Sequence, residues 1–311
     1  MLFIPYKLDI GLYRIPFLTA LVCLVCIVTF TTQLASRTTY VRRVTSYCAQ
    51  GLDPNLEAIL AGVGDDSGFG PCIGNFLAIR KAGDRDATIA ALARSVKNLT
   101  FYPDKAADLA YKTAKIASGF DDFDLSVPQQ LTENLAYDPE HRDFVRMLTS
   151  TFAHADWSHL LGNLLFFFIF ASCLESAIGY GYFAVAFVVM AVASSIAYSL
   201  SVSNSESALP TIGLSGVVMG MMVMITALMP KARIWCLFWI LLIVRRFTLP
   251  LFVIALWYVG WNVYDFMHDD GASHINYMAH IGGAISGLVM GVLFALLNRD
   301  RMRAIASEMP H

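Results

Sequence analysis

A series of long apolar stretches constrains this chain more than any other feature of its sequence. The first runs from about residue 11 to residue 34, and five more follow after residue 158. A helix of about 20 apolar residues is long enough to cross the ~30 Å hydrocarbon core of a bilayer. Charged residues make up only 15% of the 311 residues, whereas soluble domains carry about a quarter. The sequence therefore predicts an integral membrane protein.

The five later stretches are interpreted as membrane spans, and they cover residues 159–173, 180–202, 214–229, 249–266 and 275–297. A shorter apolar piece at 234–244 cannot cross the bilayer unaided and is expected to be interfacial or re-entrant. The first stretch is interpreted as an uncleaved anchor rather than a signal peptide, because its apolar part is long and no A-x-A site follows it. The predicted fold is an all-α membrane protein with a bundle of six transmembrane helices.

Positive charges set the expected orientation of these spans. Lys and Arg concentrate on the cytoplasmic side of membrane proteins. Lys7 and Arg14 lie at the N-terminal end of the first span, and the tail 299–311 is basic, so both termini are expected in the cytoplasm. Three arginines after the first span depart from the rule, but they lead into a long segment, where the charge bias counts for less. We expect a multi-pass protein of a bacterial inner (cytoplasmic) membrane.

A segment of mixed polar and charged composition separates the first span from the second. It covers residues 36–148 and shows helical periodicity at 84–99 and 103–116. We predict a small, mostly helical extracytoplasmic insert whose scattered acids and bases form a solvated surface.

The insert carries two features whose roles the sequence leaves open. Cys48 and Cys72 are the cysteines that fall in polar sequence. If this region lies outside the cytoplasm, a disulfide between them and two free thiols are equally compatible with the sequence. Asn98-Leu99-Thr100 matches a glycosylation sequon, which matters only in a eukaryotic secretory lumen.

The step Gly213-Leu214-Ser215-Gly216 opens the span at 214–229. A helix N-terminus offers unpaired backbone N–H groups and a partial positive charge. A serine there can attack a carbonyl while its own N–H helps to hold the resulting oxyanion. Gly213 and Gly216 leave room for a substrate backbone. Alone this pattern is weak, since a serine at a helix start is most often an N-cap.

His280 can supply the base that Ser215 needs. It lies near the outer end of the last span, beside a stripe of small residues spaced four apart that comprises Ala279, Gly283, Gly287 and Gly291. Gly216 and Gly220 form a matching pair on the serine helix. Small residues let helix backbones approach closely, so His280 is expected within reach of Ser215, which needs an adjacent base. No Asp or Glu lies at a comparable depth near His280, and a Ser–His dyad is therefore predicted.

Two polar residues share one face of the span at 159–173. His159 and Asn163 are four residues apart, and His154 precedes them. Polar groups at membrane depth are functional candidates by default, although they can also serve as interhelical hydrogen bonds. Because Ser215 and His280 are predicted to form a dyad, we interpret His159 and Asn163 as side-chain donors to the oxyanion, with His154 as a third candidate.

Together these motifs resemble the rhomboid family of intramembrane serine proteases. They read Gly213-x-Ser215-Gly216, Ala279-His280-x-x-Gly283 and His154-x4-His159-x3-Asn163, in order on the expected spans. The resemblance covers residues 150–298, about half the chain, and the first span by position. It implies a six-helix bundle with Ser215 as nucleophile and His280 as base. The oxyanion site would comprise His159, Asn163 and the Ser215 N–H.

The same resemblance implies an activity and a domain order. The expected activity is cleavage of single-span membrane proteins in the lipid bilayer near their outer face, with no metal or cofactor. The expected domains are an N-terminal tail with the first transmembrane helix (1–35), the insert between the first and second spans (36–148), a catalytic membrane core of five further helices (149–298) and a basic cytoplasmic tail (299–311).

Three departures from the family pattern raise questions about this chain. Many members carry a tyrosine four residues after the serine, packed against the catalytic histidine, and here that position is Met219. The Trp-Arg pair common after the first span is absent. The loop after that span is about a hundred residues longer than usual. The insert is expected to recruit substrate, gate access or bind a protein partner.

Two functions of other classes are also compatible with the sequence. One is an inert rhomboid-like protein that binds or chaperones membrane helices. The other is a metal-dependent membrane protein or transporter that uses the histidines at His154, His159, His268, His274 and His280. No H-E-x-x-H motif is present and no acid lies beside the histidines on a span. The net charge of −2 gives no reason to expect nucleic-acid binding.

Overall fold

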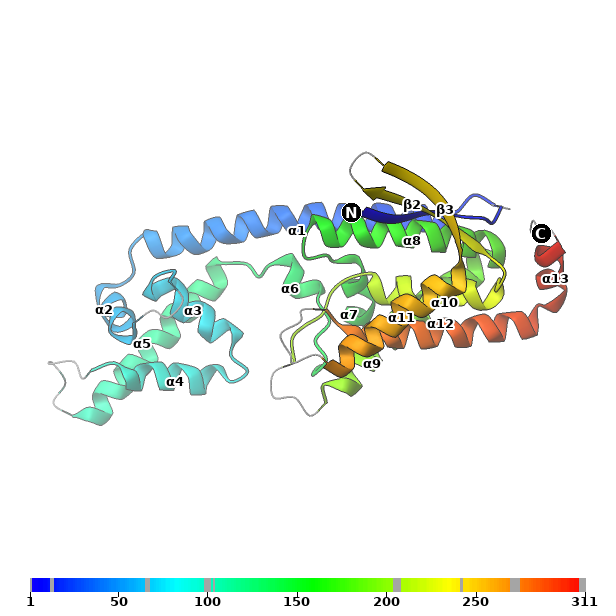
Figure 1. Cartoon of the computed structure of the whole chain (residues 1–311). Helices are drawn as coiled ribbons and strands as arrows, with labels where there is room; N and C mark the ends of the chain where they lie inside the picture. Colours follow the sequence, from blue (N-terminus) through cyan, green and yellow to red (C-terminus); the bar gives the residue numbers. More distant parts are fainter. Residues whose placement is uncertain are drawn as a thin grey trace. The chain divides into compact units, whose positions relative to one another are not determined.

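The structure is a computed structural model that describes residues 2–11, 14–64, 68–97, 102, 104–203, 208–240, 243–268 and 275–307. Helices make up most of these residues (Figure 1), as predicted. The chain divides into two compact units. The larger unit joins Met1–Gln33 to Thr132–His311, and the smaller unit comprises Leu34–Leu131.

The larger unit is a helical bundle with a small sheet. Its helices are α1 (Phe17–Ala49, which continues into the smaller unit), α6 (Leu131–Leu135), α7 (Phe144–Thr149), α8 (Trp157–Ile178), α9 (Tyr180–Ser201), α10 (Ser215–Leu228), α11 (Leu251–His268), α12 (Tyr277–Leu297) and α13 (Arg299–Ser307), with a 3-10 turn at Ser150–Phe152. Among the described residues, α1, α8, α9 and α12 are long and apolar enough to cross a bilayer. The count of six spans stays a prediction, because α10 is a shorter apolar helix.

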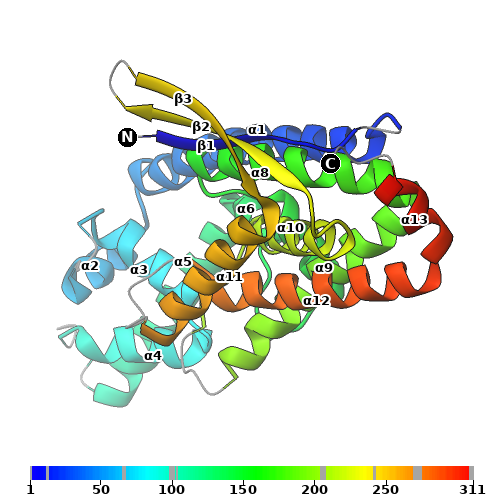
Figure 2. The ribbon, with the colours of Figure 1, turned by 45° about the vertical axis from the view of Figure 1, so that its right-hand side comes forward.

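A three-stranded antiparallel sheet is an element that the sequence analysis missed (Figure 2). Strand β1 (Leu2–Leu8) pairs with β2 (Arg233–Ile240), which pairs with β3 (Ile243–Pro250). The described residues of the apolar piece at 234–244 therefore belong to strands β2 and β3, and its predicted interfacial or re-entrant position stays a prediction. Ile234 and Cys236 are buried in β2, whereas Arg233 is exposed. This alternation is typical of a half-buried strand.

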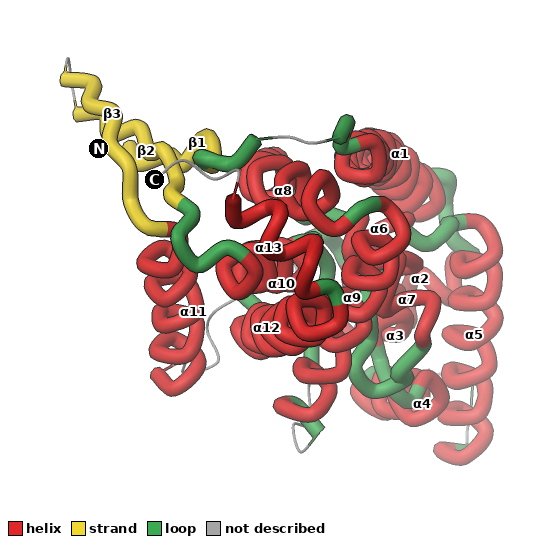
Figure 3. Tube along the Cα trace, turned by 90° about the vertical axis from the view of Figure 1, so that its right-hand side faces the viewer, coloured by secondary structure: helices red, strands yellow, loops and turns green. Residues whose placement is uncertain are grey.

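The closest helix packing in the larger unit joins α10 to α12 (Figure 3). A Cβ added to Gly283 would fall on the backbone carbonyl of Gly216, and one added to Gly287 would fall on the carbonyl of Gly220. The two backbones touch because these positions carry no side chain. The predicted contact between the two glycine patterns is confirmed.

A buried carboxylate connects α8 to the start of α1. Glu175 is fully buried and accepts hydrogen bonds from the Leu18 N–H at 2.8 Å, the Thr19 N–H at 2.7 Å and the Thr19 hydroxyl at 2.6 Å. The first N–H groups of a helix have no partner within the helix, and a negative group there also interacts well with the helix dipole. The Arg14 N–H donates to Ser176 Oγ at 2.9 Å. Together these bonds anchor the first span to the second.

The smaller unit is helical, as predicted for the insert. Besides the end of α1 it contains α2 (Pro54–Val63), α3 (Pro71–Lys81), α4 (Arg85–Ser95) and α5 (Lys105–Ser126). The periodic stretches at 84–99 and 103–116 correspond to α4 and to the first half of α5. Residues 132–148, which the sequence analysis placed in the insert, belong to the larger unit.

An aromatic cluster and a disulfide stabilise the smaller unit. The core is built around Phe76 and Phe123, whose rings are 5.1 Å apart. Cys48 and Cys72 form a disulfide with a Cα–Cα distance of 6.0 Å, which decides the pairing that the sequence left open. The sequon at Asn98 lies outside the described residues.

We predict that Gly287→Ala separates α10 from α12. The added methyl group meets backbone that cannot rotate away, so the free energy of unfolding should fall by roughly 1–3 kcal/mol, measured by thermal or chemical unfolding in detergent. Gly181→Ala in α9 is the matched control, because its Cβ meets nothing within 4 Å. Equal stability of the two variants would contradict the close contact.

We also predict that Glu175→Leu weakens the attachment of α1. The substitution leaves the N–H groups of Leu18 and Thr19 buried without an acceptor, at a cost of about 1–3 kcal/mol for each unpaired group. Glu175→Gln keeps one acceptor oxygen and should lose less. Glu133→Gln, at an exposed position of α6, is the control and should leave the melting temperature unchanged. If all three variants have the same melting temperature, Glu175 does not hold α1 in place.

Candidate active site

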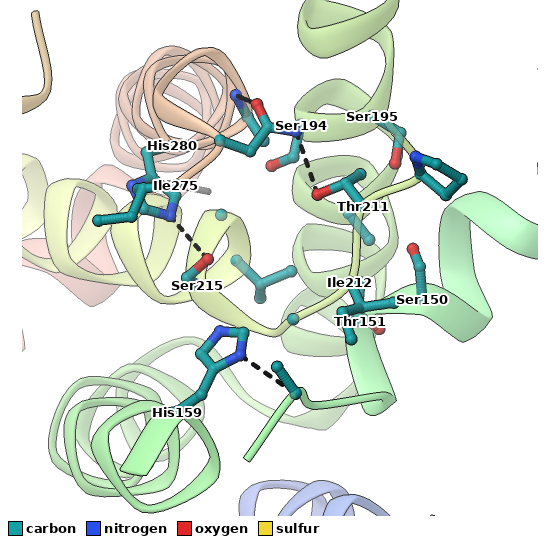
Figure 4. A pocket seen from close by; sticks show the side chains of 18 of the residues that line it. Ser150, Thr151, His159, Ser194, Ser195, Thr211, Ile212, Ser215, Ile275 and His280 are labelled. Carbon is teal, nitrogen blue, oxygen red and sulfur yellow. Dashed lines mark hydrogen bonds between the residues drawn. The ribbon is translucent and has the colours of Figure 1, made fainter. Parts of the chain in front are cut away.

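Ser215 and His280 meet at the facing ends of two helices. Ser215 is the first residue of α10, and His280 lies in the first turn of α12. His280 Nε2 lies 2.7 Å from Ser215 Oγ, and both side chains are half-buried (Figure 4). A serine and an imidazole within hydrogen-bond distance are the arrangement that nucleophilic catalysis by serine requires.

The loop before Ser215 is held by three hydrogen bonds to Thr211. Thr211 and Tyr137 exchange two backbone hydrogen bonds, of 2.9 and 3.0 Å. Asn276 caps α12 by accepting from the Ala279 N–H, and its amide also donates to Thr211 Oγ1 at 3.1 Å. One side chain therefore ties the start of the histidine helix to the loop that leads into the serine helix.

His159 lies on the other side of Ser215 from His280 (Figure 4). The Asp156 side chain caps α8 by accepting from the His159 N–H at 2.8 Å, which fixes this residue in the first turn. The Ala155 N–H donates to His159 Nδ1 at 3.4 Å. In a neutral ring the proton is then on Nε2, which is available as a donor.

Gly213 is required between this ring and the serine. Its φ is +126°, which side chains rarely tolerate, and a Cβ there would lie 2.8 Å from His159 Nε2. The Gly213 N–H donates to the Ser150 carbonyl at 2.9 Å. No side chain caps the first turn of α10 in the part of the chain that the structure describes. The backbone N–H of Ser215, in this first turn, therefore has no side-chain capping partner among the described residues.

Asn163 carries a buried donor without an acceptor. The side chain is 8% exposed, and its Nδ2 has no hydrogen-bond partner among the described residues. The same atom lies 3.8 Å from the Cβ position of Gly213. Leaving a buried donor unpaired costs about 1–3 kcal/mol. A donor kept unpaired next to the serine loop has the property required of an oxyanion-hole group.

His154 lies beside His159 but differs from it in its hydrogen bonds. The two rings are 5.2 Å apart, and His154 Nδ1 is 3.3 Å from the Phe152 carbonyl. Burial lowers the pKa of His154 to about 4, and the proximity of His159 adds to this. A neutral ring that donates from Nδ1 to Phe152 leaves Nε2 without a proton. Its Nε2 has no partner among the described residues.

Asn262 is a polar side chain at the site that the sequence analysis did not select. It lies in α11, and its Oδ1 is 2.5 Å from His280 Nδ1. The signal was present in the sequence, because an asparagine within an apolar stretch is a functional candidate by default. Its partner could not be identified, since the contact joins two different helices.

Two cavities reach Ser215 and His280. The first, of about 460 Å³, has a mixed lining in which the hydroxyl groups of Ser150, Thr151, Ser194, Ser195 and Thr211 lie among apolar residues. The second, of about 300 Å³, is lined mainly by apolar residues of α8, α10 and α11. The pair therefore lies between a cavity that offers several hydroxyl groups to water and a more apolar cavity suited to a hydrophobic side chain.

The described histidines among the five do not assemble into a metal site. Within the described ranges, no three His, Cys, Asp or Glu side chains come close enough together to hold a metal ion. His268 Nδ1 instead lies 2.8 Å from the Tyr264 carbonyl. His274 lies outside the residues that the structure describes.

A family model for the Rhomboid domain matches residues 141–296 of the chain. The chain belongs to the rhomboid family. A search of curated proteins found no match. Rhomboid proteins are typically intramembrane serine proteases, and the matched region contains Ser215, His280, His159 and Asn163.

In this rhomboid protein, Met219 occupies the position where a tyrosine is common. Met219 is buried and lines the apolar cavity together with His280 and Asn262. A thioether cannot offer the strong hydrogen bond of a polar group. The side chain that contacts the other ring nitrogen of His280, Nδ1, is Asn262 of α11 and not residue 219 of the serine helix.

We predict that Asn163→Leu leaves the rhomboid fold as stable as the wild type or more stable. The substitution removes a buried donor that has no partner, so the free energy of unfolding should not fall, whereas the rate should drop by roughly 10²–10³ if the amide binds the oxyanion. Gln33→Leu is the control. Gln33 is buried, accepts from the His154 N–H at 3.1 Å and donates to Thr132 at 2.8 Å, so its loss should destabilise. A destabilised Asn163→Leu protein would show that Asn163 stabilises the fold through a hydrogen bond between helices.

Proposed function

We propose that this rhomboid protein is an intramembrane serine endopeptidase that uses Ser215 as nucleophile and His280 as general base. The observation that carries the proposal is the 2.7 Å contact between Ser215 Oγ and His280 Nε2 at the uncapped start of α10. Donors on α8 lie on the opposite side of the serine. A nucleophile, a base and an oxyanion site are the three parts that acyl transfer needs.

In the acylation step, the Ser215 hydroxyl proton moves to His280 Nε2 while Oγ bonds to the carbonyl carbon of the scissile peptide. The carbonyl π electrons move to oxygen and form an oxyanion. This oxyanion accepts hydrogen bonds from His159 Nε2–H, Asn163 Nδ2–H and the Ser215 N–H. When the electrons return, the C–N bond breaks and the proton on His280 passes to the leaving amine.

Water completes the reaction in the deacylation step. A water molecule gives a proton to His280 while its oxygen bonds to the acyl carbon. The bond between that carbon and Ser215 Oγ then breaks, and the proton returns to the serine. The hydroxyl-bearing cavity that opens onto Ser215 supports this step, because the hydrocarbon core supplies no water.

The length of α10 supports cleavage within the membrane. Its 14 residues rise roughly 21 Å at ~1.5 Å per residue, which is less than the ~30 Å hydrocarbon core. With the end of α10 at the cytoplasmic face, Ser215 lies below the outer surface. We infer that the substrates are single-span membrane proteins cut near their outer face, by an enzyme with both termini in the cytoplasm, in a bacterial inner membrane. The insert is proposed to recruit a protein partner or substrate.

A cleavage assay on a single-span model substrate in liposomes tests this function. We expect Ser215→Ala and His280→Ala to lose at least ~10³-fold in rate, because each removes a member of the nucleophile–base unit. A fluorophosphonate probe should label the wild type but not Ser215→Ala.

Two other outcomes would each point to a different function. A wild type that binds the substrate but never reacts with the probe is an inert rhomboid-like protein. Cleavage that persists in Ser215→Ala and stops with a chelator requires a metal mechanism.

A further inference from the structure

We infer that Asn262 is a positioning residue that fixes the tautomer and orientation of His280. The inference rests on the proposed function, because it assigns a role in preparing the base of that reaction. The geometry points to a relay of Ser215, His280 and Asn262 in which a neutral amide on a third helix occupies the place of an acid.

The orientation of the Asn262 amide follows from its other hydrogen bond. Its Nδ2 donates to the Tyr258 carbonyl one turn earlier in α11, at 2.8 Å. The Oδ1 atom is therefore the one directed at His280 Nδ1, at 2.5 Å. A carbonyl oxygen can only accept, so Nδ1 must carry the proton.

This proton on Nδ1 determines the state of the other ring nitrogen. A neutral imidazole has one N–H, so Nε2 has a lone pair and accepts from the Ser215 hydroxyl at 2.7 Å. The opposite tautomer would set two lone pairs against each other at the Asn262 contact. It would also leave Nε2 unable to take the serine proton. Asn262 thus favours the tautomer that works as a base.

The same contact holds His280 after it has taken the proton. The imidazolium keeps its Nδ1–H on Asn262 Oδ1, so the ring does not turn away between proton uptake and proton delivery to the leaving amine. The described residues at the apolar cavity include no Asp or Glu. With Met219 where a tyrosine is common, Asn262 is the polar side chain that α11 directs at the base.

The test compares three asparagine variants of the full-length protein in liposomes. Asn262→Leu removes the acceptor, and Asn262→Asp restores an acceptor oxygen. Asn298→Leu is the matched control, because Asn298 also donates to a carbonyl one turn earlier, that of Phe294, at 3.1 Å. Asn298 lies at the other end of α12 from His280. The readouts are kcat and KM for cleavage and the rate of fluorophosphonate labelling.

We expect Asn262→Leu to lower kcat and the labelling rate by roughly 10- to 100-fold, part of the ~10²–10⁴-fold that a positioned base contributes. KM should change little, because the amide acts on the base and not on substrate binding. Asn262→Asp should recover most of the rate, and Asn298→Leu should behave as the wild type. A wild-type rate for Asn262→Leu overturns the inference. So do equally low rates for the Leu and Asp variants when both melt like the wild type.

A spectroscopic measurement separates this inference from the proposed function. In protein labelled with ¹⁵N-histidine, the His280 Nδ1–H signal should appear in the wild type and in Asn262→Asp. It should be lost in Asn262→Leu and in His280→Ala, which assigns it. If the wild type cleaves nothing but shows this signal, the proposed function fails while the positioning contact stands. If the wild type cleaves and the signal is unchanged in Asn262→Leu, the positioning role is wrong and the protease remains.

Discussion

The contact between the backbones of α10 and α12 is the constraint on which the site depends. Gly283 lies against the Gly216 carbonyl and Gly287 against the Gly220 carbonyl, so the two helices touch at two successive levels. This double contact fixes their separation and also their register along the axis. His280 lies one turn before Gly283, and Ser215 directly precedes Gly216. The 2.7 Å distance between Ser215 Oγ and His280 Nε2 is therefore a consequence of how closely the glycines pack.

Buried polar groups serve opposite purposes at the two ends of the α8 helix. Near its C-terminal end, Glu175 accepts three hydrogen bonds from α1, so its burial contributes to the attachment of the first span. Near its N-terminal end, Asn163 keeps a donor without a partner among the described residues. A buried polar group with all its hydrogen-bond partners stabilises the fold. A buried donor without a partner can instead form a hydrogen bond with a ligand. The same helix is thus anchored at one end and, within the described residues, carries an unpaired donor near the other.

The sequence predicted those features that depend on short-range pattern. Apolar length located the helices, the spacing of Gly216, Gly220, Gly283 and Gly287 predicted their contact, and the positions of Ser215 and His280 at helix starts predicted the pair. The sheet was missed, because β1 and β2 lie more than 220 residues apart in the chain and neither shows which segment it pairs with. Asn262 and Glu175 were missed for a related reason. Their partners lie on other helices, so no spacing within one helix reveals them.

The choice of an amide beside His280 and a carboxylate at Glu175 follows from what each site provides. Burying an ionised group in low dielectric costs several kcal/mol unless donors surround it. Glu175 has three donors and the positive end of the α1 dipole, so a charge is tolerated there. At Asn262 the donor is one imidazole N–H, so a neutral acceptor meets the need of this site without the burial of a charge. An amide oxygen still selects the His280 tautomer, because selection requires only an acceptor at the right place. A site within a membrane can therefore have the orienting function of an acid without its charge.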